Sequence, residues 1–162
     1  MNTLVKLYFF IAILFFSICS YAFQEKMSDP EYNQWLKDQF SESHRALIPV
    51  VTVADMFFSC NIDRKIDKNG YTIKQLVLNL DRDLLAEKLS SCLKNDAIDS
   101  DHAINYGLQG CFHEQLLKLP KTEREQKMKL VLRAIASLSI EERLKSLTQC
   151  VTDQAINYLP KK

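Results

Sequence analysis

Four cysteines lie in two stretches of the chain that resemble each other. When residues 72–99 are moved forward by 58 positions, five identities appear: Leu80, Leu89, Cys92, Ala97 and Ile98 coincide with Leu138, Leu147, Cys150, Ala155 and Ile156. A shift of 51 also places Ser59-Cys60 on Gly110-Cys111. The pattern predicts two similar units, each of which contains two cysteines.

Residues 1–22 have the composition of a signal peptide. Lys6 supplies a positive charge, and the apolar run 7–18 is too short to span a bilayer. Ser20-Tyr21-Ala22 then has small residues at the positions that a signal peptidase reads. An uncleaved anchor is one alternative, and lipid attachment at Cys19 is another, although Ile18 is larger than the residue that lipidation signals place there.

Cleavage after Ala22 leaves 20 basic and 20 acidic side chains, which balance. The remaining 140 residues are enough for one domain. A net charge near zero argues against nucleic acid or an anionic membrane as the main partner. We therefore expect no nucleic-acid binding, and contact with a membrane only through the signal peptide.

An exported chain meets oxidising conditions, in which four cysteines form two disulfides. No Cys-x-x-Cys spacing favours the alternative of a zinc site. Three pairings are possible, and the positions of the cysteines along the expected helices favour one of them. In an up-down-up trio the first and third helices run parallel, and each cysteine lies about ten or eleven residues into its helix, at a similar height. The sequence predicts the bridges Cys60–Cys92 and Cys111–Cys150.

The mature chain has a helical pattern, without strand-like alternation and with only three glycines. Asp29-Pro30 begins a first helix, and Pro49 is expected to end or kink it. A second helix, about 50–67, ends at the turn Lys68-Asn69-Gly70. Further starts are predicted from caps, namely Thr72-x-x-Gln75, Asp81, Ser100 or Asp101, Thr122-x-x-Glu125 and Ser139-x-x-Glu142.

These elements predict an all-α fold. We expect an N-terminal helix followed by two tandem three-helix units, about 50–98 and about 100–158, each with an internal disulfide. Both units are expected to pack as one compact domain over 23–162. The small residues Ala103, Gly107 and Gly110 share a helix face, which favours close helix packing, with a ligand site as the alternative.

Residues suited to catalysis or to metal binding do not form a recognisable pattern. An apparent calcium loop at 67–71 would place Lys65 and Leu76 at positions that require carboxylates. His102 and His113 are about 16 Å apart along one helix and cannot share an ion. Asp96 and Asp101 near His102 are an alternative cation site, but acidic residues are common before helix starts. We expect no catalytic residues, no metal and no cofactor.

Two apolar segments are candidates for binding. Tyr32, Trp35 and Phe40 recur along the first helix, which either caps the helical units or presents an aromatic recognition face. Phe57 and Phe58 belong to a dense apolar stretch that is either core or the lining of a pocket.

The sequence predicts a periplasmic or secreted protein that acts by protein–protein interaction rather than by catalysis. An inhibitor or a toxin-immunity type of protein is one concrete form of this hypothesis. The alternative is a carrier of a small apolar molecule in a cavity between helices.

Overall fold

The computed structural model describes residues 30–160, and before Phe40 it describes only the side chains of residues 34, 35, 37 and 38. The regular elements in these residues are all helices: α2 (Pro30–Arg64), α3 (Ile73–Leu78), α4 (Arg82–Leu93), α5 (Asp101–Gln115), η1 (Leu116–Lys118), α6 (Lys121–Ser137), α7 (Ile140–Ala155) and η2 (Ile156–Tyr158). The all-α prediction is confirmed. The predicted signal peptide lies outside the described residues.

Side-chain caps begin four of the helices, as the sequence predicts. The hydroxyl of Thr72 accepts a hydrogen bond from the N–H of Gln75, whose side chain accepts one from the N–H of Thr72. Ser139 and Glu142 form the same reciprocal pair at the start of α7. Such caps satisfy N–H groups that have no partner within the helix. The remaining two are Asp81 for α4 and Ser100 for α5.

The predicted helix boundary at Pro49 is wrong, because α2 continues through this residue. Proline cannot donate the helical hydrogen bond to the carbonyl four residues earlier, that of Arg45. Both residues are exposed, so water can reach this carbonyl. The hydroxyl of Thr52 donates to the carbonyl of Ile48 at 2.8 Å, which supplies a further bond beside the proline. The predicted N-terminal helix and the first helix of unit one are therefore a single element.

The end of α2 also differs from the expected boundary near residue 67. Lys65 has a positive φ of 52°, which takes the chain out of the helix after Arg64. The side chain of Asn61 then holds the turn, since it donates to the carbonyl of Asp67 at 3.0 Å and accepts from its N–H at 2.7 Å.

The predicted capping box at Thr122 and Glu125 does not form. Helix α6 begins at Lys121, one residue before Thr122, and Pro120 occupies the cap position. The carbonyl of Pro120 accepts the first helical hydrogen bond, from the N–H of Arg124 at 2.9 Å, so the helix starts directly after the proline. Thr122 is consequently inside the first turn.

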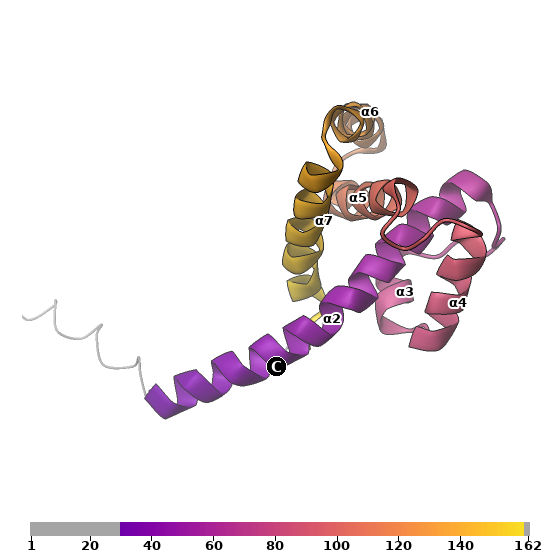
Figure 1. Cartoon of the computed structure of the whole chain (residues 1–162). Coiled ribbons are helices and arrows are strands. Elements are labelled where there is room, and N and C mark those ends of the chain that lie inside the picture. Colours follow the sequence, from indigo (N-terminus) through magenta and orange to yellow (C-terminus); the bar gives the residue numbers. More distant parts are fainter. Residues whose placement is uncertain (1–29, 161–162) are drawn as a thin grey trace, which may run out of the picture. The chain divides into compact units, whose positions relative to one another are not determined.

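Both predicted disulfides are confirmed. Cys60–Cys92 joins α2 to α4 and Cys111–Cys150 joins α5 to α7, and the Cα atoms are 6.2 Å apart in each bridge. Each bridge thus links the first and third helices of a unit, with α3 or α6 between them in the chain (Figure 1). Two disulfides are typical of proteins that fold in an oxidising compartment.

The small-residue face of α5 is a close contact between helices. A Cβ atom added to Gly110 would lie 2.4 Å from the carbonyl oxygen of Asp55 in α2. A Cβ on Gly107 would lie 2.9 Å from a methyl group of Leu147 in α7. Only glycine at residue 110 lets the backbones of α2 and α5 approach this closely.

The segment Phe40–Arg64 of α2 contributes much of the core. Val51, Ala54 and Phe57 are buried there. Within the described residues this segment alone is long and apolar enough to cross a membrane by length and composition. A buried core helix meets the same two criteria, and the burial of these side chains accounts for the apolar character of the segment.

Residues 40–160 form one compact unit, and the described residues 30–39 do not belong to it. These earlier residues are the first turns of α2, where the side chain of Gln34 donates to Asp38 at 2.9 Å. The prediction of one domain over 23–162 stays a prediction.

Candidate functional site

Helix α6 is less buried than its sequence predicts. Met128, Val131, Ile135 and Leu138 follow the spacing of a buried stripe, yet only Ile135 is fully buried, and the other three are half-buried. Leu130, beside this stripe, is 60% exposed. By contrast, α5 buries six residues and α7 buries five. The apolar face of α6 is thus only partly covered by the rest of the unit.

A groove of about 330 Å³ lies along this face, and we call it the α6 groove. Its lining comes from three helices and one cap residue: Leu108 and Phe112 of α5, Leu130, Val131, Ala134 and Ile135 of α6, Leu138 directly after α6, and Ser146 of α7. Ser146 is the single polar residue in this lining. An apolar hollow of this size, at the junction of helices, has the properties of a binding site.

Comparison of the two units gives a reason why the groove is open. At the offset of 58 residues, Leu76 of α3 corresponds to Ala134 of α6. The side chain of Leu76 is fully buried, whereas Ala134 is exposed and lines the groove. The shorter side chain in unit two leaves empty the space that a leucine would help to fill.

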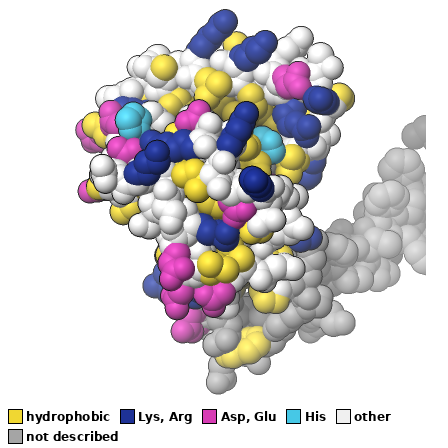
Figure 2. Space-filling view, turned by 90° about the vertical axis from the view of Figure 1, so that its right-hand side faces the viewer, with side chains coloured by type: hydrophobic (Ala, Val, Ile, Leu, Met, Phe, Trp, Pro, Cys, Tyr) yellow, Lys and Arg dark blue, Asp and Glu magenta, His cyan; other side chains and the backbone are white. Residues whose placement is uncertain are grey.

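Positive charge accumulates around α6. Residues 118–133 include six basic and two acidic side chains, a net charge of +4, so the rest of the chain carries −3. Figure 2, in which the α6 end of the protein is uppermost, shows Lys and Arg side chains beside hydrophobic ones in its upper part. The segment that contains the first turns of α6 is therefore the basic part of a chain that is otherwise slightly acidic.

Lys127 lies at one end of the α6 groove. It precedes Leu130 and Val131 by three and four residues, which places it on the same helix face. Its ammonium group is 3.7 Å from a carboxylate oxygen of Glu123, and both side chains are about half exposed. Glu142 of α7 is engaged in the cap of that helix, and its hydrogen bonds with Ser139 lower the pKa of its carboxyl group.

His113 lies on α5, next to Phe112 of the groove. Its ring packs on Phe58 with the centroids 4.7 Å apart, and its Nδ1 is buried without a hydrogen-bond partner. Burial, together with the nearby charge of Arg124, lowers the pKa of this histidine. The ring is therefore neutral at pH 7 and acts as a packing residue beside the groove.

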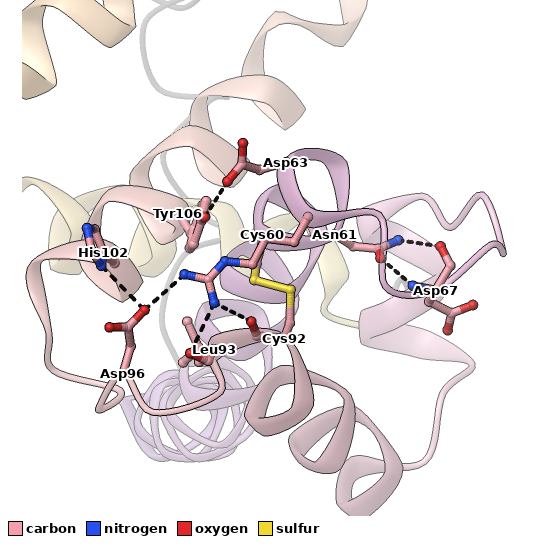
Figure 3. Close-up of a disulfide and its surroundings, with 10 residues drawn as sticks. Cys60, Asn61, Asp63, Asp67, Cys92, Leu93, Asp96, His102 and Tyr106 are labelled. Carbon is pink, nitrogen blue, oxygen red and sulfur yellow. Dashed lines mark hydrogen bonds and ion pairs between the residues drawn. A yellow bond between two sulfur atoms is a disulfide. The ribbon is translucent and has the colours of Figure 1, made fainter.

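A cluster of polar residues surrounds the first disulfide (Figure 3). The guanidinium of Arg64 donates to the carbonyls of Cys92 and Leu93, at 2.6 and 3.0 Å, and to Asp96 at 3.0 Å. Arg64 thereby satisfies the last carbonyls of α4, and its hydrogen bond to Asp96 lowers the pKa of that carboxyl group. His102 lies 3.3 Å from the same carboxylate. This arrangement is a helix cap that also joins the ends of α2 and α4.

Asp55 is a buried carboxyl group at the crossing of α2 and α5. Its Oδ1 accepts a hydrogen bond from the side chain of Gln154 at 3.0 Å, while its Oδ2 and the Oε1 of Gln154 have no partner. Burial raises the pKa of Asp55 well above its ordinary value, against the opposing effect of the Gln154 hydrogen bond. The protonated acid gains an O–H donor, which complements the free acceptor on Gln154.

The raised pKa of Asp55 makes the stability of the folded protein depend on pH. The folded protein keeps this proton at pH values where the unfolded chain has lost it. Below the ordinary pKa of an aspartic acid the group is protonated in both states and contributes no pH dependence. As the pH rises from there towards the raised pKa, the free energy of unfolding decreases.

The aromatic residues that the sequence singles out lie in different environments. Phe57 is 1% exposed and packs 6.2 Å from the ring of Tyr71, so it belongs to the core. Phe58 is half-buried against His113, and neither phenylalanine lines the α6 groove. Phe40 is 50% exposed and stacks on His44, and Trp35 is 47% exposed. The side chain of Tyr32 lies outside the described residues.

A second, smaller hollow of about 170 Å³ lies between α2, α4 and the segment that follows α4. Val53, Leu89 and Ile98 are among its lining residues. It is half the size of the α6 groove and is also mainly apolar.

Over residues 30–160, no group of three or more His, Cys, Asp or Glu side chains is arranged to hold a metal ion. Two members of the acidic cluster before α5 have other partners, since Asp96 pairs with Arg64 and Asp101 lies 3.2 Å from Arg143.

The sequence contains a signal for the α6 groove. Val131, Ile135 and Leu138 have the spacing of core residues, yet the same helix carries Leu130 and Leu132 outside the stripe and a short Ala134 within it. A helix with surplus leucines and a gap in its apolar face indicates a surface that is not filled by its own unit.

The chain was compared with models of protein families, with curated proteins and with solved structures, and none of the three comparisons finds a match.

Proposed function

We propose that this protein is exported and acts by binding another protein through the α6 groove. The observation that carries the proposal is an open apolar groove of about 330 Å³ on a helical unit whose first and third helices are crosslinked. A rigid surface loses little conformational entropy when a partner binds, which favours affinity. The protein is then a binding protein, with no catalytic residues of its own.

Export is supported by the two disulfides and by the signal peptide expected at residues 1–22. We propose the periplasm or the extracellular space as the location. An inhibitor or an immunity-type protein, which blocks a partner by occupying its surface, is compatible with this location and with a rigid binding face.

The test is site-specific photocrosslinking in the cells that produce the protein. A benzophenone side chain replaces Leu130 in the groove or, as a control, Leu132, which is 44% exposed on the same helix and does not line the groove. The two residues are about 200° apart around the helix. We expect a protein adduct from residue 130 and none from residue 132. Equal adducts from both, or no protein adduct from residue 130, would refute the proposal.

A second candidate function is the carriage of a small apolar ligand. It is favoured by the volume of the α6 groove, which lies at the lower end of the range for ligand sites, and by its apolar lining. Native mass spectrometry of the protein from its own host tests it. A small-molecule adduct that is present in the wild type and lost in Ala134→Leu would support the carrier, and a bare protein mass would count against it.

A further inference from the structure

We infer that the α6 groove binds an amphipathic helix of the partner, with apolar residues along one face and acidic residues at the end that meets Lys127. This inference rests on the proposed function and adds the chemistry of the partner. It follows from the length of the groove, from its lining and from the charge at one of its ends.

The length of the groove matches a short helical contact. The lining runs from Leu130 in α6 to Leu138, the residue after the end of this helix, and these eight steps span about 12 Å along the helix axis. This distance is a little over two helical turns, the span of three apolar residues at positions i, i+3 or i+4, and i+7. Helices that bind in hydrophobic grooves use this spacing for their anchoring residues.

The lining restricts the occupant to apolar anchors. Ser146 is the only side chain in the lining that offers a conventional hydrogen-bond partner, and it is the single lining residue that α7 contributes. A polar group that enters the groove loses its water without gaining a partner elsewhere, which is unfavourable. A helix satisfies its own backbone groups internally, whereas an irregular segment would bring unpaired N–H and C=O groups into the groove.

The charges favour acidic residues at one end of the occupant. Lys127 lies one turn before the first lining residues and, by helix spacing, on the same face of α6. Its present partner, Glu123, is held at 3.7 Å in an exposed pair, a type of contact that contributes little and can be exchanged. The occupant is thus oriented, with its carboxylates towards the first half of α6.

A displayed library of helical peptides tests this chemistry. Each peptide carries three apolar anchors at i, i+4 and i+7, and its terminal positions vary among Glu, Lys and Gln. The library is selected on the oxidised wild-type protein and counter-selected on Ala134→Leu, which introduces the residue found at the corresponding position of α3. We expect enrichment of Glu at one end of the peptides, and binding that Ala134→Leu weakens at least about tenfold.

Matched charge variants test the orientation. Lys127→Glu should weaken the selected peptides up to about fivefold, as for a partly exposed ion pair. Lys129→Glu, on the opposite face of α6, should leave their affinity unchanged. Equal enrichment of Lys and Glu, or equal effects of the two variants, would overturn the inference. A dimer of the wild type that Leu130→Glu dissociates would also overturn it, since a second copy would then occupy the groove.

The failure of this inference is distinguishable from the failure of the proposed function. A protein adduct from residue 130 supports binding at the groove whatever the partner segment is. Mapping of the crosslinked peptide then decides the inference: an amphipathic helix with terminal carboxylates supports it, and a basic or non-helical segment overturns it. If residue 130 yields no protein adduct, both proposals fail together.

Discussion

Replacement of Gly110 by alanine tests the close contact between α2 and α5. The new Cβ would lie 2.4 Å from the carbonyl oxygen of Asp55 and 2.7 Å from its Cα, whereas ordinary contacts begin near 3.4 Å. Both atoms belong to backbone, so no side-chain rotation relieves the overlap. The two helices must separate by about 1 Å, and a gap of that size removes a quarter to a half of the dispersion energy of the contacts it opens.

The expected magnitude combines two opposing effects. Overpacking of a well-packed core costs about 1–3 kcal/mol and occasionally more, and the rigid backbone places this site at the upper end. Alanine in place of glycine inside a helix stabilises the helix by about 1 kcal/mol, because alanine has the higher helix propensity. We therefore expect Gly110→Ala to lower the free energy of unfolding by about 2 kcal/mol.

Urea denaturation followed by circular dichroism at 222 nm, with both disulfides intact, measures this loss. Two alanine substitutions serve as controls. In Gly107→Ala the nearest atom is a methyl group of Leu147 at 2.9 Å, which can move, so a loss below about 1 kcal/mol is expected. Gly70→Ala meets no atom within 4 Å and should change stability by less than about 0.5 kcal/mol. Similar stabilities of all three variants would refute the reasoning.

Three further predictions concern stability. Removal of either disulfide by paired Cys→Ala substitution should lower the free energy of unfolding by about 3–4 kcal/mol. The two losses should be nearly equal, because the separations of 32 and 39 residues are similar. A difference above about 2 kcal/mol between them in urea melts would contradict this. In the wild type, the free energy of unfolding should decrease as the pH rises above about 4, by at most about 1.4 kcal/mol per pH unit. Asp55→Asn should remove this decrease and raise the stability at pH 7. If the wild type and the variant show parallel dependences of stability on pH, Asp55 is not protonated in the folded protein. Arg64→Met should cost about 1–2 kcal/mol through loss of the α4 cap, whereas Arg45→Met, at an exposed site, should cost less than about 0.5 kcal/mol in the same thermal or urea melts.

Local sequence patterns predicted the helical elements well where a cap or a turn marks them. Thr72, Asp81, Ser100 and Ser139 each begin a helix as expected, because a side chain that bonds to the nearby N–H groups acts within three residues. The same local rules failed at Pro49. There the burial of the residues that follow, Val50 and Val51 among them, outweighs the missing hydrogen bond.

The disulfide pairing was also predictable, since it depends on helix lengths and directions rather than on details of packing. Cysteines at similar distances from the starts of parallel helices come to the same height, and the Cα separation of 6.2 Å in both bridges agrees with this. The candidate site was less predictable. Phe57 and Phe58 are as apolar as the residues of the α6 groove, and the sequence does not distinguish a core side chain from a groove-lining one.

The sequence by itself determined the all-α class and most helix starts, because capping, turn formation and helix register depend on residues near one another in the chain. It also determined both disulfides, because the helix lengths bring the paired cysteines to similar heights. Only the tertiary structure decided which apolar faces are covered. Helix α3 packs against η2, from the far end of the chain, and its Leu76 is buried, whereas α6 packs against the preceding α5 and η1 and leaves Ala134 exposed. The α6 groove is a consequence of that packing, since an apolar stripe has the same sequence pattern whether its own domain or a partner covers it.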